Sequence, residues 1–257
     1  MSEDVVGAGP IRWMYAFVDR PVEGFGRACD FWTTITDTRL SPFRGELDEF
    51  VTLLPDGADP CVKAQGIAAG DGGAHLDLAV EDVPELVASA LRLGATLVSD
   101  HGSWAVLRSP GGQLFCAVPW HGESARPPVA KAPDGTTSRL DQVSIDLAPN
   151  AYDSEVAFWT DLTGWASHTG ALPEFHLVKP PAGLPLRILL QRLGEDRPTA
   201  AHLDLACSDI DATRARHEKL GAAFVSRGAR WVVMRDPVGG TYCLTGRDPE
   251  TGSLPTG

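Results

Sequence analysis

The chain lacks the motifs of several common catalytic and nucleotide-binding sites. It contains no GxSxG, P-loop, Rossmann glycine or HExxH pattern. Its two glycine pairs, Gly111-Gly112 and Gly239-Gly240, are predicted to form hairpin turns rather than phosphate-binding loops. The sequence therefore gives no support for a serine hydrolase, a P-loop or dinucleotide-binding protein, or an HExxH metalloprotease.

Cysteine is scarce, and its spacing suggests neither disulfides nor a zinc knuckle. The five cysteines are odd in number and form no CxxC pair. In a reducing compartment such residues are free thiols. We therefore expect no disulfide among Cys29, Cys61, Cys116, Cys207 and Cys243.

Basic residues and long apolar runs are also in short supply. Lys and Arg number 22 against 34 Asp and Glu, which gives a net charge of −12 and a pI near 4.9. Nucleic acids and anionic membranes require a basic surface, so neither is expected as a partner. No basic-then-apolar leader and no run of membrane-spanning length is present, and we expect a cytoplasmic protein. With 257 residues, 43% of them hydrophobic, the chain can bury one large or two ordinary cores.

What the sequence does contain is an internal repeat. The stretch His75-Leu76-Asp77-Leu78-Ala79 recurs, letter for letter, at residues 202–206. Without a gap, residues 75–118 match residues 202–245 at 18 of 44 positions. Alternation predicts a buried strand in each copy, with the His and the Asp side by side on one face. A repeat of about half the chain indicates duplicated domains.

Each half is predicted to contain two modules of similar element order. In the first half we expect strands at 11–18, 50–54 and 61–67 around a helix at 24–36, with a further short strand near 38–42. A second module follows, with a strand at 74–80, a helix at 83–93 capped by Asp82, and strands at 96–99, 104–108 and 113–118.

The pattern restarts after residues 121–138, a stretch rich in Pro, Ala, Gly and Ser that we interpret as a linker. Strands are expected at 139–147, 175–178 and 186–193, with a helix at 153–163. The last module has a strand at 201–206, a helix at 210–220, and strands at 223–226, 231–235 and 241–245. Residues 1–10 and the tail from 246 onward are expected to be unstructured.

This arrangement resembles the vicinal oxygen chelate superfamily, which includes glyoxalase I, bleomycin-resistance proteins, fosfomycin-resistance enzymes and extradiol dioxygenases. The similarity lies in the Phe-Trp-Thr segments at 31–33 and 158–160, the two His-Leu-Asp-Leu strands, and the Leu-Gly-Ala helix ends. It implies an α+β fold in which four βαβββ modules form two glyoxalase-like domains with curled, cup-shaped mixed sheets. The domains would span 11–120 (modules 11–67 and 74–118) and 139–246 (modules 139–193 and 201–245). A fold of this kind supports many chemistries, so the resemblance does not specify an activity.

The resemblance also implies which residues occupy the family's metal-ligand positions. They are Tyr15, Gln65, His75 and Cys116 in the first half, and Gln142, Gln191, His202 and Cys243 in the second. Only the His survives in each half, and the family's two glutamate positions are taken by a glutamine and a cysteine. One imidazole with amides and a phenol makes a poor metal site. We therefore expect no cofactor, with a divalent metal as the alternative; its candidate ligands would be Gln142, Gln191, His202 and Cys243.

Several of these residues admit a structural or a functional interpretation. His75 and His202 are either inherited positions hydrogen-bonded to Asp77 and Asp204 or to water, or groups that contact ligand. The two cysteines are either inert core thiols or thiols aimed at ligand, and Trp104 and Trp231 either pack at the mouth of the cup or stack on a flat ligand.

We expect a small-molecule-binding protein that binds or sequesters a partly apolar or aromatic compound without an obligatory metal. The alternative is a metal-dependent lyase, isomerase or dioxygenase with a non-standard ligand set; metal-free catalysis by His75 or His202, or decay of one half, also remains open. The protein is expected to be a monomer or homodimer. The expected ligand-contacting residues are Tyr15, His75, Asp77, Trp104, Cys116, Gln142, His202, Asp204, Trp231 and Cys243.

Overall fold

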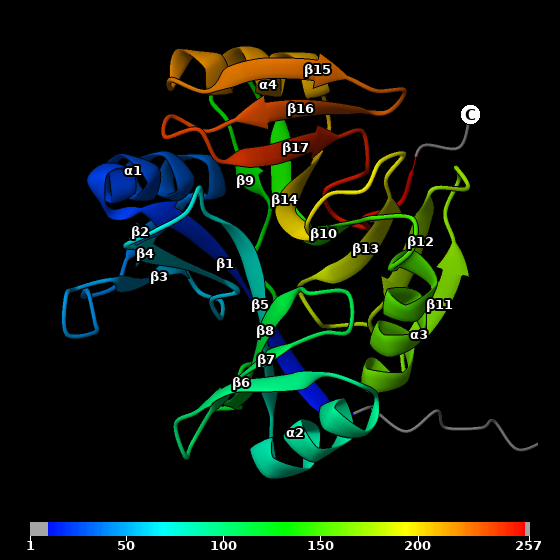
Figure 1. Ribbon diagram of the computed structural model, residues 1–257. Coiled ribbons are helices and arrows are strands. Elements are labelled where there is room, and N and C mark those ends of the chain that lie inside the picture. Colours follow the sequence, from blue (N-terminus) through cyan, green and yellow to red (C-terminus); the bar gives the residue numbers. More distant parts are fainter. Residues whose placement is uncertain (1–9, 255–257) are drawn as a thin grey trace, which may run out of the picture.

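The computed structural model describes residues 10–254 and contains two mixed sheets with four helices, an α+β fold (Figure 1). The predicted fold class is confirmed. Residues 1–9, which were expected to be unstructured, lie outside the described part of the chain. No helix within residues 10–254 is long and apolar enough to cross a membrane.

The first sheet is built by two modules. The first module consists of β1 (Ile11–Pro21), a 3-10 turn η1 (Val22–Gly24), α1 (Phe25–Thr36), β2 (Thr38–Leu40), β3 (Phe50–Pro55) and β4 (Val62–Ile67). The second consists of β5 (Gly73–Val80), α2 (Val83–Arg92), β6 (Thr96–Asp100), β7 (Ala105–Arg108) and β8 (Leu114–Pro119).

The second sheet repeats this arrangement. Its first module consists of β10 (Thr137–Leu147), α3 (Tyr152–Thr163), β11 (Ala166–Thr169), β12 (Phe175–Lys179) and β13 (Arg187–Arg192), and the short β9 (Ala130–Lys131) pairs with β10. Its second consists of β14 (Ala200–Cys207), α4 (Ile210–Lys219), β15 (Ala223–Arg227), β16 (Trp231–Arg235) and β17 (Thr241–Thr245).

The strand order is the same in both sheets. It is β2-β3-β4-β1-β5-β8-β7-β6 in the first and β11-β12-β13-β10-β14-β17-β16-β15 in the second. In each, the longest strand pairs antiparallel with the repeated His-Leu-Asp-Leu strand at the centre. The repeated helices begin alike, because Asp82 and Asp209 each accept a backbone N–H bond at 2.9 Å from the residue three positions later.

Two short strands were not predicted, and one expectation about local structure, that of an unstructured tail, was wrong. Residues 121–138 contain the short strand β9 and the start of β10. The sequence pattern did not reveal β9, because a two-residue strand flanked by turns has no detectable periodicity. Residues 166–169 form β11, a short and largely exposed edge strand without an apolar alternation. The tail is ordered through residue 254: the Gly252 N–H donates to Asp248 O at 2.7 Å, and the Glu250 carboxylate pairs with Arg139 at 2.9 Å.

The two domains pack through equivalent contacts: the helix of the first module in each domain contacts the turn between the last two strands of the other domain. The Trp32 indole of α1 donates to the Asp236 carboxylate in the β16–β17 turn. Arg20, near the end of β1, pairs with the same carboxylate at 2.6 Å. On α3, the Trp159 indole donates to Glu155 at 2.8 Å, and Glu155 accepts the backbone N–H of Gly111 in the β7–β8 turn. Each helix therefore packs on the partner domain, as Figure 1 shows for α1 beside β17.

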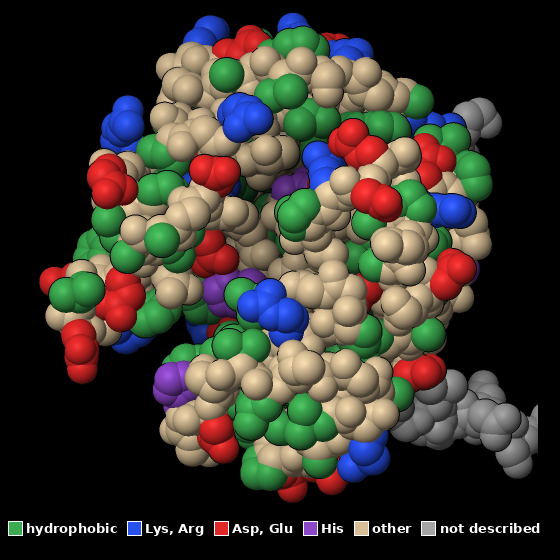
Figure 2. All heavy atoms as spheres, viewed as in Figure 1, with side chains coloured by type: hydrophobic (Ala, Val, Ile, Leu, Met, Phe, Trp, Pro, Cys, Tyr) green, Lys and Arg blue, Asp and Glu red, His purple; other side chains and the backbone are tan. Residues whose placement is uncertain are grey.

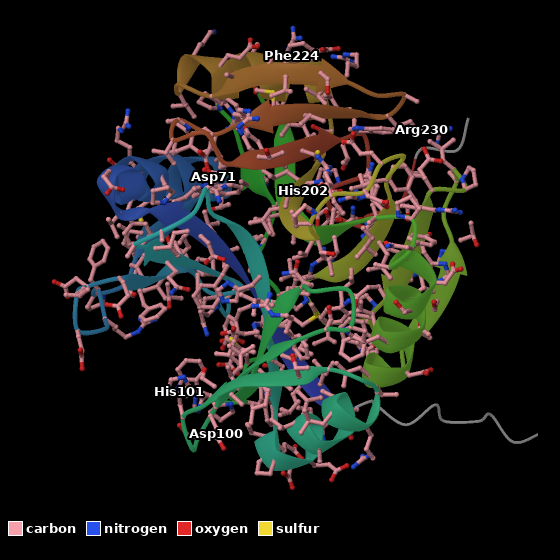
Figure 3. All side chains as sticks on the ribbon, in the orientation of Figure 1. Asp71, Asp100, His101, His202, Phe224 and Arg230 are labelled. Carbon is pink, nitrogen blue, oxygen red and sulfur yellow. The ribbon has the colours of Figure 1, made fainter. Side chains whose placement is uncertain are left out.

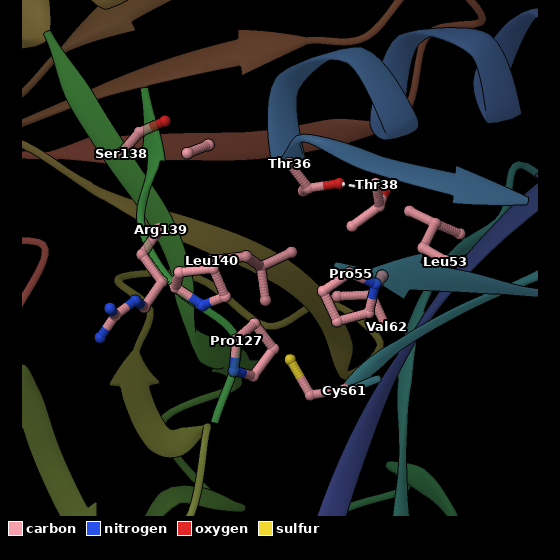
Figure 4. A pocket seen from close by; sticks show the side chains of 12 residues that line it. Thr36, Thr38, Leu53, Pro55, Cys61, Val62, Pro127, Ser138, Arg139 and Leu140 are labelled. Atoms are coloured by element: carbon pink, nitrogen blue, oxygen red, sulfur yellow. Dashed lines mark hydrogen bonds between the residues drawn. The ribbon is translucent and has the colours of Figure 1, made fainter. Parts of the chain in front are cut away.

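A small gap remains between the domains, between the start of β10, the segment before it and the edge of the first sheet (Figure 4). Its volume is about 30 Å³. That space is close to the size of a single water molecule, so it is a packing gap and not a ligand site.

Candidate functional site

The predicted cup residues lie on one face of each sheet. In the first sheet, Tyr15 stands opposite Asp77, and Asp77 stands opposite Cys116. In the second, Gln142 stands opposite Asp204, and Asp204 opposite Cys243. Cross-strand partners share a face. We call these faces, with the space they enclose, cup 1 and cup 2.

In cup 1 the histidine is held by a carboxylate of the neighbouring strand. His75 Nδ1 lies 2.7 Å from Asp19 Oδ2, whereas its Nε2 is 3.8 Å from Asp77 Oδ1. The expected bond to Asp77 is therefore replaced by one to Asp19. Burial by itself would lower the pKa of His75, but Asp19 and Asp77 raise it above the ordinary value.

The rest of cup 1 is filled by its own side chains. The Lys63 ammonium lies 3.0 Å from Asp77 Oδ2 and 3.7 Å from the centre of the Tyr15 ring. The Phe17 ring stacks on His75 with a centroid distance of 4.2 Å. The Tyr15 hydroxyl donates to Glu123 in the segment that follows β8. We call the salt bridge between Lys63 and Asp77 the Lys63 ion pair.

Cup 2 keeps the same four-residue arrangement at its base. His202 Nδ1 lies 3.5 Å from Asp146 Oδ2, and its Nε2 lies 3.4 Å from Asp204 Oδ1. Burial opposes protonation, but Cys243, Asp146 and Asp204 raise the pKa of His202 well above its ordinary value. Burial raises the pKa of the Cys243 thiol, although His202 acts in the opposite direction.

Asp204 is held by two further neutral side chains. Its Oδ2 accepts hydrogen bonds from Gln142 Nε2 and from Ser144 Oγ, the latter at 2.8 Å. Its Oδ1 is buried without a hydrogen-bond partner in the described structure. The base of cup 2 is thus a polar network that is complete on one side of the carboxylate and open on the other.

Cup 2 encloses a cavity of about 510 Å³. Figure 2 shows a hollow near the centre of this view, and Figure 3 labels His202 on β14, the strand that contributes Asp204 to the lining of the cavity. Residues of seven strands and of the folded-back tail line the cavity. The apolar part of its wall is formed by Phe175, Leu177, Leu189 and Trp231, and the rings of Phe175 and Trp231 meet edge to face at 5.6 Å.

The difference between the cups follows from three substitutions between equivalent positions. Where cup 1 has Tyr15, Phe17 and Lys63, cup 2 has Gln142, Ser144 and Leu189, as the strand registers show. Each replacement in cup 2 is shorter or lacks the charge. The space that cup 1 fills with two rings and an ammonium is therefore part of the cavity in cup 2.

Each cup brings together three possible metal ligands. The ligand atoms of His75, Asp77 and Cys116, and those of His202, Asp204 and Cys243, lie within 4.8 Å of one another. Imidazole, carboxylate and thiolate are a set that Zn²⁺ accepts. Cup 1 does not fit a cation, because the Lys63 ammonium already pairs with Asp77 there. Cup 2 has an uncharged leucine at that position and fits one.

The other predicted site residues have distinct positions. Gln191 lines the cavity, and Gln65 lies on the equivalent face of cup 1, paired with Phe50. Trp231 begins β16 at the cavity wall. Trp104 precedes β7 and stacks on His101 in the β6–β7 hairpin at 3.9 Å, at the outer end of the first sheet.

Sequence reasoning missed the carboxylates that hold the histidines and the cations of both cups. Asp19 and Asp146 lie at the same offset as the repeat, 127 positions apart, so the self-alignment contained their signal. Lys63, Arg187 and Arg247 have no counterpart of like charge in the other half, and the repeat carries no signal for them.

The family-model comparison finds the glyoxalase-like domain twice, at residues 16–118 and 142–245. The chain belongs to the glyoxalase-like domain family. This confirms the predicted membership of the vicinal oxygen chelate superfamily. No curated protein matches the chain significantly in sequence.

Solved structures share the fold of this glyoxalase-like protein. The Mn(II)-bound glyoxalase of Novosphingobium aromaticivorans aligns at 18% identity with a TM-score of 0.61, over 97% of this chain and 88% of that one. The 2,3-dioxygenase LapB of Pseudomonas sp. KL28 aligns at 12% identity with a TM-score of 0.64, over 96% and 98%.

A fusion of a xylose isomerase-like TIM barrel with 4-hydroxyphenylpyruvate dioxygenase aligns at 13% identity with a TM-score of 0.61. This chain, 95% of which is aligned, covers only 51% of that protein. At such identities the similarity shows the fold, and a function has to be argued from the site.

Proposed function

We propose that this protein binds a small, partly apolar or aromatic organic molecule in cup 2, without an obligatory metal. The observation that carries the proposal is the cavity of about 510 Å³, with an apolar wall above the polar base formed by Asp204, Gln142 and Ser144. Ligand sites of proteins have volumes of about 300–1,000 Å³, apolar walls and a few fixed polar groups.

The polar base supports binding without a metal. Hydrogen bonds from Gln142 and Ser144 hold one oxygen of Asp204, and the carboxylates of Asp146 and Asp204 lie beside His202, so these groups have protein partners on one side. In cup 1 an ammonium takes the position a cation would need, which supports the view that the equivalent residues of cup 2 also do not require a metal. A buried carboxylate with charged or hydrogen-bonded partners is stable.

The second candidate is a metal-dependent lyase, isomerase or dioxygenase. It is favoured by the clustering of ligand atoms from His202, Asp204 and Cys243 within 4.8 Å. A divalent metal there would act as a Lewis acid on substrate oxygens. This chain would contribute the three ligands, and Gln142 would orient Asp204.

The proposal includes a cytoplasmic location and a monomeric or homodimeric state. Support for the location comes from the five cysteines, all of which are buried free thiols. Size-exclusion chromatography with light scattering measures the state, and a larger assembly would contradict it.

Binding is tested with 2-naphthalenemethanol, a neutral aromatic probe, by titration calorimetry and tryptophan fluorescence. We expect the wild type to bind it and Leu189→Lys to bind at least about tenfold more weakly, because a lysine there repeats the Lys63 arrangement of cup 1 and occupies the space beside Asp204. Leu189→Met is the matched control, since it keeps an apolar side chain of similar volume. Equal affinity of Leu189→Lys and the wild type would place the binding site outside cup 2.

Elemental analysis of protein purified without a metal-affinity tag separates the two candidates. We expect no stoichiometric divalent ion, also after incubation with Zn²⁺, Mn²⁺, Ni²⁺ and Fe²⁺. The matched variants are His202→Ala for cup 2 and His75→Ala for cup 1. About one ion per chain that His202→Ala loses and His75→Ala retains would make the metal-dependent enzyme the working model.

A further inference from the structure

The wall of cup 2 carries an excess of cations at one end. Four lysine and arginine side chains line the cavity against one carboxylate, that of Asp204, although the whole chain has a net charge of −12. The four cations are Lys179, Arg187, Arg230 and Arg247. The charge at this end of the cavity is therefore opposite in sign to that of the whole chain, which favours a negatively charged ligand.

The strand registers bring these cations to the same end. Arg187 stands opposite Gln142, and Lys179 follows Val178, which pairs with Ile188, so the two cations lie on neighbouring strands β12 and β13. Arg230 precedes β16 and receives the backbone N–H of Gly246 on its carbonyl, directly before Arg247. Figure 3 shows Arg230 at the turn between β15 and β16.

The two inner guanidiniums are only partly neutralised. Arg187 and Arg247 share one carboxylate, that of Asp141, whose side chain is 2% exposed. Arg247 bonds through Nη2, and its buried Nε has no partner in the described structure. Each guanidinium has five N–H donors, so donors remain for a ligand after Asp141 is satisfied. Lys179 and Arg230 are exposed and form no ion pair within residues 10–254.

Residues 251–254 of the C-terminal tail complete the cationic end of the cavity. Gly252, at φ 69°, approaches so closely that a Cβ there would meet the Arg187 guanidinium, and its carbonyl accepts a bond from Arg187 Nη2. The segment therefore holds Arg187 against the cavity. A ligand entering cup 2 meets a fixed guanidinium and not a freely moving surface side chain, which reduces the entropy lost on binding.

These cations are particular to cup 2. At the equivalent positions of the first half, Arg187 corresponds to Cys61 and Arg247 to Trp120. The duplication therefore does not account for them, and they accompany the open cavity and not the filled one.

We propose that the ligand of cup 2 is an aromatic carboxylate, oriented with its carboxylate toward Arg187 and Arg247 and its ring against Leu177, Leu189 and Trp231. The planar guanidinium matches a carboxylate through paired N–H donors, and the apolar wall covers the ring. This inference rests on the proposed function, because it specifies the compound class bound at the same site.

The test compares three probes that share a naphthalene ring and carry an anionic, a neutral or a cationic head group: 2-naphthoate, 2-naphthalenemethanol and 2-naphthylmethylamine. Titration calorimetry at low and physiological salt measures each dissociation constant. We expect 2-naphthoate to bind at least about tenfold tighter than the alcohol, and the amine to bind most weakly. Higher salt is expected to weaken the naphthoate only.

Two variants test which cations produce the preference for naphthoate over the alcohol. Arg247→Gln is expected to remove most of the preference for naphthoate over the alcohol. Lys179→Gln/Arg230→Gln, which changes exposed residues only and leaves the fold intact, is expected to reduce it by about threefold or more. The matched control is Lys131→Gln/Arg235→Gln, at exposed cations outside the cavity.

The outcomes separate this inference from the proposed function. Binding of the alcohol with no preference for naphthoate, or a preference that both variants retain, overturns the anionic ligand and leaves the proposed function standing. Failure of all three probes to bind overturns both.

Discussion

Replacement of Lys63 by methionine is expected to destabilise the protein, because it removes one partner of the Lys63 ion pair and leaves Asp77 buried. The Lys63 side chain is 19% exposed and that of Asp77 only 5%. Methionine keeps most of the side-chain volume, so the change in charge dominates the effect. The loss is expected in the free energy of unfolding of the whole chain or of its first domain.

The magnitude follows from the contacts that Lys63 makes. A hydrogen bond to a charged group contributes about 1.5–3 kcal/mol, and breaking a fully buried pair costs about 3–5 kcal/mol. The ammonium 3.7 Å from the Tyr15 ring centre adds a cation–π contact of about 0.5–2 kcal/mol. Lys63 keeps some solvent access, so we expect a loss of about 2–4 kcal/mol, or a fall in Tm of roughly 5–12 °C.

Urea denaturation followed by tryptophan fluorescence and circular dichroism measures this loss. The double variant Lys63→Met/Asp77→Asn is expected to recover most of it, since the uncompensated charge is removed. Leu189→Met, at the equivalent position of cup 2, is the matched control and is expected to cost less than about 1.5 kcal/mol. A loss below about 1 kcal/mol for Lys63→Met, or no recovery in the double variant, would refute the view that this ammonium compensates Asp77.

Two further predictions concern buried titratable groups. Burial lowers the pKa of His217 to about 3, so the unfolded chain takes up its proton below pH 6.5 while the folded chain does not; the free energy of unfolding should fall by about 1.4 kcal/mol per pH unit from pH 6.5 toward 3 on account of this residue. His217→Gln should lack that contribution, and equal pH slopes of the two proteins in urea denaturation would contradict the assignment. Burial raises the pKa of Cys29 to about 11 and those of Cys61 and Cys207 to about 12; the folded protein should therefore resist iodoacetamide at pH 8, whereas the unfolded chain should be alkylated at five sites, as mass spectrometry would count.

The sequence predicted the fold well because its two strongest signals are local and repeated. Strand alternation assigned His75 and Asp77 to one face, and the self-match at a constant offset identified the duplicated modules. Both signals need only neighbours along the chain. The resemblance to the family, and not alternation, placed Gln65 and Gln191 on the cup faces; Gln191 lines the cavity of cup 2.

The site itself could be predicted only in part, because its decisive contacts join different strands. Alternation gives the face of a residue but not the residue beside it, and His75 is held by Asp19, 56 positions away. Lys63 would be assigned to a solvated face by composition alone, yet it occupies the cup. The contribution of the tail was missed for the same reason: Gly252 reaches Arg187 across 65 positions.

Cup 1 and cup 2 share the same set of polar residues at their floor but differ in whether the space above it is filled. Both keep the Asp-His-Asp-Cys set, so this set alone does not determine whether a cup is filled. A cavity lowers stability because its wall loses packing contacts, whereas a filled cup with a compensated carboxylate does not bear that cost. Each domain also anchors the other through Asp236 and Glu155. A filled first domain is therefore suited to support the open second domain, and we expect variants that weaken cup 1 to reduce ligand binding only when they reduce stability as well.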